Sequence, residues 1–131
     1  MKKIFDVDKN KIFFFHNLLT EVIKKNNYKF NGKLDQLHNY FTNKEINQIR
    51  LKCFKKINSV DWARKIKEIC GDQMFYLLGQ DLLIQSKINL SIQLPGDKGS
   101  ILDIHSDCWS ADTPFQLNLW IPLTNAYSTN S

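Results

Sequence analysis

Hydrophobic and polar residues follow two different periods along this chain. Over the first 80 residues, apolar side chains recur three or four positions apart, which is the spacing of one face of a helix. Four amphipathic helices are therefore predicted, with apolar stripes at Ile12, Phe15, Leu19, Val22 and Ile23; Leu34, Leu37 and Phe41; Ile46, Ile49, Cys53, Phe54 and Ile57; and Trp62, Ile66, Ile69 and Cys70. Beyond residue 86 the period is two, which is typical of β-strands.

Polar residues between these stripes predict where the helices begin and end. Residues 24–27, Lys-Lys-Asn-Asn, end the first helix, and residues 42–45, Thr-Asn-Lys-Glu, form a capping box that begins the third. Ser59 is predicted to be the N-cap of the fourth helix and Gly71 to stop it. Residues 74–84 are apolar without a clear period, so a buried strand and a helix end both stay open there.

Two stretches in the second part of the chain, 88–94 and 115–123, each carry an aliphatic face and a polar or aromatic face. The aliphatic faces are Ile88, Leu90, Ile92 and Leu94, and Leu117, Leu119, Ile121 and Leu123; the opposite faces are Asn89, Ser91 and Gln93, and Gln116, Asn118 and Trp120. The first stretch runs into a predicted turn at Pro95-Gly96-Asp97. Helices followed by such strands favour an α+β fold, in which the helices pack on one sheet of a barrel or jelly roll.

Between these two stretches lies the tripeptide His105-Ser106-Asp107. Residues two apart in a strand point to the same face, so an imidazole nitrogen and a carboxylate oxygen can meet at one divalent metal. Such a pair provides two of the three ligands of a 2-His-1-carboxylate iron site, which leaves positions free for a cosubstrate and dioxygen. The tripeptide alone is also compatible with an ordinary hydrogen-bonded pair.

Three stretches around this tripeptide closely resemble one enzyme family. They are Ile-Gln-Leu-Pro-Gly-Asp at 92–97, Ile-His-Ser-Asp-Cys-Trp-Ser-Ala-Asp-Thr-Pro-Phe at 104–115 and Leu-Trp-Ile-Pro-Leu-Thr-Asn-Ala-Tyr at 119–127. They resemble the 2-oxoglutarate- and Fe(II)-dependent oxygenases found sporadically in bacterial carbohydrate-biosynthesis gene clusters, which are relatives of the phytanoyl-CoA dioxygenases. The resemblance covers roughly residues 82–128, and Ala111 stands where the family usually has Gly.

The resemblance implies a double-stranded β-helix, or jelly-roll, core on which N-terminal helices pack. We expect one partial oxygenase domain over 1–131, with 1–80 as mainly helical support and 81–131 as the first jelly-roll strands with the metal motif. The resemblance also implies that His105 and Asp107 bind Fe(II), that 2-oxoglutarate is the cosubstrate, and that Gln93, Asn118 and Trp120 contact the cosubstrate or substrate.

The family's chains continue past the point where this one stops. A second iron-binding histidine and a basic residue for 2-oxoglutarate would lie in that continuation, and His16 and His38 lie instead on predicted helices. We therefore expect a fragment whose jelly roll is incomplete at the C-terminus.

The expected activity is the hydroxylation, by dioxygen, of a carbohydrate or carbohydrate precursor in polysaccharide biosynthesis. The alternative is a non-catalytic or inactive truncated jelly-roll module that binds a sugar or a metal. The third iron ligand discriminates between the two, because an open triad with a second histidine implies redox chemistry.

Composition and charge limit the kinds of binding partner and the cellular compartment that we expect for this protein. The chain of 131 residues has a formal net charge of +5, with 16 basic and 8 acidic side chains in residues 1–80 against 2 and 5 afterwards. The lysines are interleaved with Asn and Ile, which favours a solvated surface over nucleic-acid binding, so we expect no nucleic-acid partner. Three cysteines without a Cys-x-x-Cys pair, no signal peptide and no membrane span together predict a cytoplasmic protein. The sequence does not indicate an oligomeric state.

Overall fold

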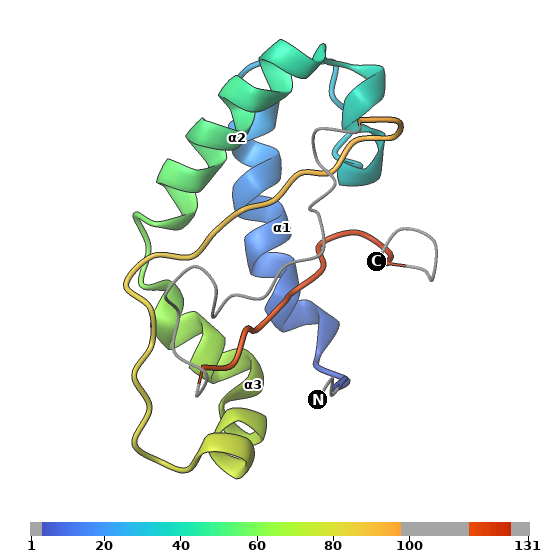
Figure 1. Ribbon diagram of the computed structural model, residues 1–131. Coiled ribbons are helices and arrows are strands. Elements are labelled where there is room, and N and C mark those ends of the chain that lie inside the picture. The colour runs from blue at the N-terminus through green and yellow to red at the C-terminus, as the bar shows by residue number, and fades with distance from the viewer. Residues whose placement is uncertain (1–3, 98–115, 127–131) are drawn as a thin grey trace.

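Helices account for the regular secondary structure of the residues that the computed structural model describes, 4–97 and 116–126 (Figure 1). The elements are α1 (Lys9–Lys24), the 3-10 helix η1 (Leu34–Asn39), α2 (Asn43–Ile57) and α3 (Trp62–Leu78). All four helices predicted from the apolar stripes are present, and the second is a 3-10 helix.

Side-chain caps begin two of the α-helices as their sequences require. Asp8 accepts a hydrogen bond from the amide of Asn10 at 2.9 Å and begins α1. The predicted capping box begins α2: the Glu45 amide donates to the Thr42 hydroxyl at 3.4 Å, and the Thr42 amide donates to the Glu45 carboxylate at 2.8 Å. These two bonds satisfy amides that a helix N-terminus otherwise leaves without partners.

Both predicted ends of α3 were wrong. Its N-cap is Asp61, which accepts from the amide of Arg64, whereas the hydroxyl of Ser59 donates back to the carbonyl of Lys56. Gly71 does not stop the helix. The backbone bends at Cys70 (φ −141°, ψ 24°) and then continues as helix to Leu78, which brings Met74 against the core.

The helix ends at Gly79, whose φ of +83° lies in the left-handed region that favours glycine. The sequence left a buried strand and a helix end both open for residues 74–84. Residues 74–78 belong to α3, so the helix end is correct for the first part of this stretch.

Two clusters of buried side chains form the core. The first lies among α1, η1 and α2 and comprises Leu19, Ile23, Phe30, Leu37, Ile46, Ile49, Cys53 and Ile57. The second lies between α1 and α3 and comprises Phe15, Trp62, Ile66, Ile69 and Cys70. No helix in the described part of the chain is long and apolar enough to cross a bilayer.

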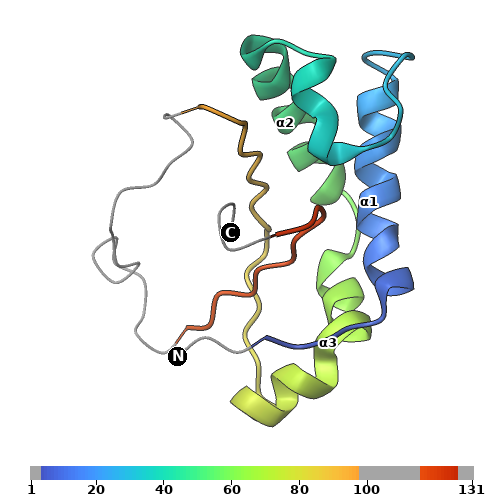
Figure 2. The ribbon, with the colours of Figure 1, turned by 90° about the vertical axis from the view of Figure 1, so that its right-hand side faces the viewer.

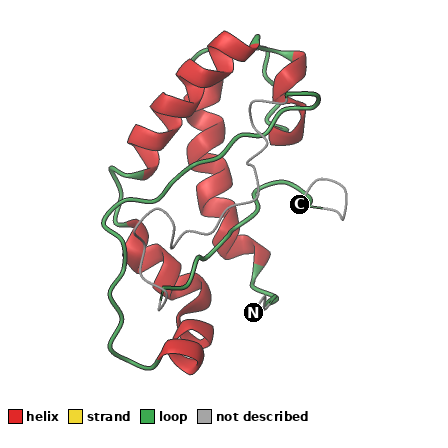
Figure 3. Cartoon of the chain, in the orientation of Figure 1, coloured by secondary structure: helices red, strands yellow, loops and turns green. Residues whose placement is uncertain are grey.

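Two non-helical stretches, residues 82–94 with a bend at 86–87 and residues 116–123, lie over one face of the helices (Figures 1 and 2). We call residues 82–94 the first extended segment and residues 116–123 the second. No residue of 4–97 or 116–126 is paired in a β-sheet (Figure 3), so the predicted jelly-roll, or double-stranded β-helix, is a wrong prediction for this part of the molecule. The alternating pattern produced extended backbone there without a strand ladder.

The first extended segment nevertheless keeps the two faces that its sequence predicts. Ile88, Leu90, Ile92 and Leu94 are half-buried and pack on the first cluster, while Asn89, Ser91 and Gln93 are exposed. The predicted turn follows, with the amide of Asp97 donating to the carbonyl of Leu94 at 3.2 Å and Gly96 at φ +74°. Proline at the second turn position and a left-handed glycine at the third match a type II turn.

The second extended segment follows its predicted pattern only at its end. Ile121 and Leu123 pack on the helices, and Leu123 touches both clusters. Leu117 and Leu119 remain 53% and 51% exposed, so the predicted aliphatic face is not buried in the first half of this segment.

Candidate functional site

The outer surface of residues 88–94 and 116–126, after the exposed Lys87, has a distinct chemical character. Residues 88–94 and 116–126 contain no Asp, Glu, Lys or Arg. Their exposed side chains are mostly amides, hydroxyls and large apolar groups, among them Asn89, Ser91, Gln93, Gln116, Asn118 and Trp120. We call this set the amide surface.

The three residues predicted to contact the cosubstrate or substrate belong to the amide surface. Gln93 lies on the outward face of the first extended segment, and Asn118 and Trp120 lie on the second. The indole of Trp120 is 63% exposed, which leaves a large aromatic plane open to a ligand. An amide side chain both donates and accepts hydrogen bonds, so this surface suits an uncharged ligand rich in hydroxyl groups.

The predicted iron ligands, His105 and Asp107, lie outside the described residues. The other two histidines lie in the helical part: His38 is exposed on η1, and His16 on α1 stacks on Phe13 with ring centroids 5.4 Å apart. Among the residues that the structure describes, no three His, Cys, Asp or Glu side chains form a group that could hold a metal.

A seam of side-chain hydrogen bonds joins the helices to the first extended segment. The Asn58 amide nitrogen donates to the carbonyl of Ile88 at 3.0 Å, and its amide oxygen accepts from the Ile88 amide at 2.9 Å. The indole nitrogen of Trp62 donates to the carbonyl of Ser86 at 3.2 Å. These bonds provide partners for backbone groups of Ser86 and Ile88. In a β-sheet, a neighbouring strand would form such bonds.

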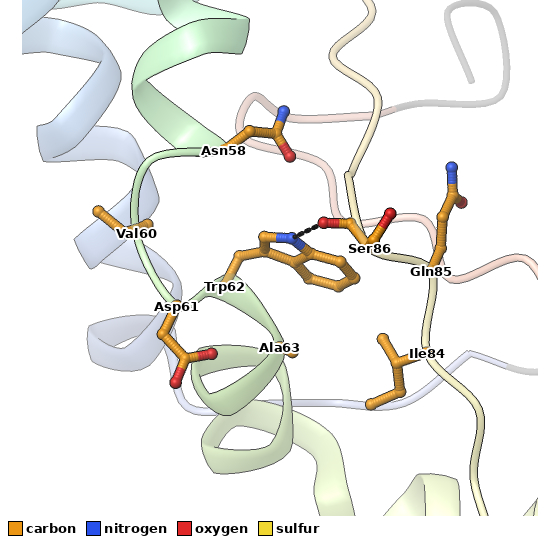
Figure 4. A pocket seen from close by; sticks show the side chains of 8 residues that line it. All are labelled: Asn58, Val60, Asp61, Trp62, Ala63, Ile84, Gln85 and Ser86. Atoms are coloured by element: carbon orange, nitrogen blue, oxygen red, sulfur yellow. Dashed lines mark hydrogen bonds between the residues drawn. The ribbon is translucent and has the colours of Figure 1, made fainter.

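A pocket of about 240 Å³ opens at this seam (Figure 4). Its lining comes from the connection between α2 and α3, from the first residues of α3 and from the first extended segment: Asn58, Val60, Asp61, Trp62, Ala63, Ile84, Gln85 and Ser86. Asp61 is the one carboxylate in this lining, and it already accepts the amide of Arg64 as an N-cap. The lining has no histidine, cysteine or lysine, so the pocket provides hydrogen-bonding groups but no acid–base or nucleophilic pair.

The sequence interpretation missed Asn58. An asparagine at the end of an apolar stripe is an ordinary helix C-cap, and nothing in the local pattern indicates a partner 30 residues away. Trp62 was correctly placed in the core, where it is 7% exposed. Its ring N–H carried a usable signal, because a buried indole nitrogen usually finds a hydrogen-bond acceptor.

Both described cysteines are buried free thiols on core faces. Burial raises the pKa of Cys53 to about 11, and it also raises the pKa of Cys70, whose thiol donates to the carbonyl of Ile66. The thiolate is the reactive form of cysteine, so neither thiol is suited to nucleophilic chemistry at neutral pH.

Comparison of the chain with models of protein families, with curated proteins and with solved structures finds no match.

Proposed function

We propose that this protein is a non-haem Fe(II)- and 2-oxoglutarate-dependent dioxygenase that hydroxylates a carbohydrate or carbohydrate precursor in polysaccharide biosynthesis. The proposal rests on the tripeptide His105-Ser106-Asp107 and on the family resemblance of the three stretches around it. The observation that carries the choice of substrate is the amide surface, because it is exposed and uncharged and lies on extended segments that flank the tripeptide in the sequence.

The amide surface matches the chemistry of a neutral sugar. Sugar hydroxyls donate and accept hydrogen bonds, and the exposed side chain of Gln93 carries both donors and an acceptor. The exposed plane of Trp120 is apolar and suits the C–H face of a sugar ring. A charged substrate would find no counter-charge within residues 88–94 and 116–126.

The two proposed ligands are chemically suited to ferrous iron. Imidazole nitrogen and carboxylate oxygen are both ligands of non-haem iron, so His105 and Asp107 would hold the metal on one side. Bound Fe(II) with 2-oxoglutarate and dioxygen would provide the oxidation of a C–H bond. Asp107 provides the only anion of the tripeptide, and a hydrogen-bond acceptor beside the other ring N–H of His105 would orient the imidazole.

Metal binding tests the proposed ligands. Asp107→Ala and His105→Ala should each abolish Mn(II) or Fe(II) binding measured by anaerobic isothermal titration. Asp103→Ala is the matched control, because it removes a nearby carboxylate outside the tripeptide, and it should leave binding largely intact. Cys108→Ser should keep the affinity within a few fold. Wild-type affinity in Asp107→Ala would refute the assignment.

Sugar binding tests the substrate class separately. On an array of neutral mono- and oligosaccharides, Trp120→Ala should reduce binding about tenfold or more, since an exposed aromatic contact contributes on the order of 1–2 kcal/mol. Leu83→Ala, which removes a fully exposed apolar side chain outside the amide surface, should leave sugar binding unchanged. Equal binding by Trp120→Ala and wild type would exclude Trp120 from the site.

A second candidate function is a non-catalytic sugar-binding module. The amide surface favours it, because that surface needs no metal to bind a sugar. Release of succinate from 2-oxoglutarate by the wild-type protein, lost in Asp107→Ala, supports the dioxygenase. Sugar binding that is independent of Asp107 and occurs without succinate release supports the module.

The buried free thiols of Cys53 and Cys70 agree with a cytoplasmic location, which we include in the proposal.

A further inference from the structure

One side chain, Asn58, links the end of α2 to the first extended segment. Its amide nitrogen donates two hydrogen bonds of 3.0 Å, to the carbonyls of Phe54 and Ile88, and its oxygen accepts from the amide of Ile88 at 2.9 Å. Both donors of the amide are therefore used. The pair of bonds to one residue reproduces what a neighbouring antiparallel strand makes with a hydrogen-bonded residue.

Trp62 holds the chain just before this residue. Residues 86 and 87 form a bend, and the extended stretch with alternating faces begins at Ile88. Trp62 binds the carbonyl of Ser86, and Asn58 binds both backbone groups of Ile88. Figure 4 shows the bond from Trp62, the first residue of α3, to the carbonyl of Ser86. The two bonds from Asn58 define which backbone edge of Ile88 faces the helices.

This edge assignment determines the register of the whole segment. Shifting an extended segment by one residue turns every side chain to the opposite face. With Ile88 held by Asn58, the aliphatic residues at 88, 90, 92 and 94 pack on the helices, and Gln93, at an odd offset from Ile88, points outward. Strand ladders normally hold such a register, and none exists among residues 4–97 and 116–126.

We propose that Asn58 is a positioning residue: it sets the register of the first extended segment and thereby directs Gln93 into the amide surface. The first part of this inference rests on the hydrogen bonds alone, and the second part rests on the proposed function. Asparagine suits the role because aspartate cannot donate to the two carbonyls, alanine makes none of the bonds, and glutamine is one methylene longer.

Proteolysis at the seam tests the register. Lys87 is exposed between the two residues that the seam holds, so trypsin cleavage after Lys87 reports local release of the segment. Asn58→Asp should accelerate this cleavage about tenfold or more, since two donors are lost and a carboxylate faces two carbonyl oxygens. Exchange of the Ile88 amide, followed by hydrogen–deuterium exchange, should accelerate in parallel. Asn17→Asp is the matched control, making the same change at an exposed position of α1, and it should leave both rates unchanged.

A second variant guards against loss of the fold. Trp62→Phe keeps an aromatic ring in the core and removes the indole N–H together with part of the fused ring, so it should accelerate cleavage after Lys87 by a smaller factor, a few fold. Far-UV circular dichroism checks that the helices remain. Cleavage after Lys87 at the wild-type rate in a folded Asn58→Asp, or in Trp62→Phe if the former does not fold, would overturn the inference.

Sugar binding separates this inference from the proposed function. With the glycan that the wild-type protein binds best on the neutral array, Asn58→Asp should weaken binding and loosen the segment, while Trp120→Ala should weaken binding without changing cleavage after Lys87. Unchanged binding by Asn58→Asp would remove the link to the amide surface. If the wild type binds no glycan, the proposed substrate fails, and the proteolysis result alone decides the role of Asn58.

Discussion

The helices and the two extended segments have equally regular apolar patterns, but their backbone groups find partners in different places. In α1, α2 and α3 the partners lie four residues away along the chain, and caps such as Thr42 provide the missing ones at the ends. In the first extended segment the partners that hold Ser86 and Ile88 are side chains of Trp62 and Asn58, 24 and 30 residues away. An apolar period of two therefore predicts which side chains of an extended segment face the core. It does not predict which groups form hydrogen bonds with the backbone of that segment.

The two regions also differ in charge and burial. The helical part carries most of the basic residues, and residues 88–94 and 116–126 carry no charged residue. Helix residues such as Ile23 and Cys53 are 1% exposed, whereas the inward-facing residues of the first extended segment (Ile88, Leu90, Ile92 and Leu94) are only half-buried. The helices therefore provide most of the stability, and the extended segments provide an open surface for a ligand.

Matched core truncations give the largest expected effect. Ile23→Ala should lower the free energy of unfolding by about 2–5 kcal/mol, because it removes fully buried methyl groups and leaves a cavity. Ile92→Ala, the same change in a half-buried residue of the first extended segment, should cost only about 1 kcal/mol. Urea denaturation followed by circular dichroism measures both values. Equal losses would show that the extended segment is as much a part of the core as α1.

Loss of the capping box should have the next largest effect. Thr42→Ala should lower the free energy of unfolding by about 1 kcal/mol, since an amide at the start of α2 loses its partner. The hydrogen bonds from Thr42 lower the pKa of Glu45. The contribution of Glu45 is therefore present above its unfolded pKa and is lost as the pH falls through its lower folded pKa. The larger cause is the backbone amide of Thr42, which Thr42→Ala keeps, so denaturation curves at neutral and acidic pH should show only slightly less acid sensitivity in Thr42→Ala than in wild type.

Gly71 within α3 and Gly79 at its C-cap should respond to substitution in opposite directions. Gly79→Ala should destabilise the protein by about 1 kcal/mol, because alanine is strained at a φ of +83°. Gly71→Ala should stabilise it by about 0.4–1 kcal/mol, because its new methyl group would meet Phe75 at 3.7 Å and Lys67 at 3.8 Å, which are ordinary contacts. Thermal unfolding measures both shifts. Destabilisation by Gly71→Ala would mean that the bend at Cys70 depends on glycine.

The smallest expected effect concerns the core thiol. With its pKa raised to about 11, Cys53 is almost wholly protonated at neutral pH, so iodoacetamide should modify it only as fast as the protein unfolds. The raised pKa also predicts that stability falls slightly as the pH rises from the unfolded thiol pKa toward 11. Mass spectrometry after labelling in buffer and in urea checks this. Rapid labelling in buffer would show that α1 and α2 separate readily.

Much of the fold was predictable because it depends on neighbouring residues. The apolar stripes predicted the helices, the residues Thr42 and Glu45 predicted a cap, and Pro95-Gly96 predicted a turn, since each of these forms bonds within a few residues. The predicted ends of α3 failed because Ser59 and Asp61 are both acceptable caps, and tertiary packing of Met74 favours a longer helix.

The candidate site was also only partly predictable from the sequence. Gln93 could be assigned to an outward face from the alternation alone, and the structure agrees. Asn118 and Trp120 are exposed as predicted, but Leu117 and Leu119 on the predicted inner face are exposed as well. His105 and Asp107 remain predictions, since they lie outside the described residues.

The sequence by itself determined the helices, the cap of α2, the turn after Leu94 and the two faces of the first extended segment. The tertiary structure alone decided which edge of that segment faces the helices, how far α3 continues, and that Ile88 and Leu123 bridge both core clusters. The physical reason is the distance along the chain between partners. Helical hydrogen bonds and turns form between near neighbours, whereas an extended segment obtains its partners only when distant parts of the chain have already been brought together by packing.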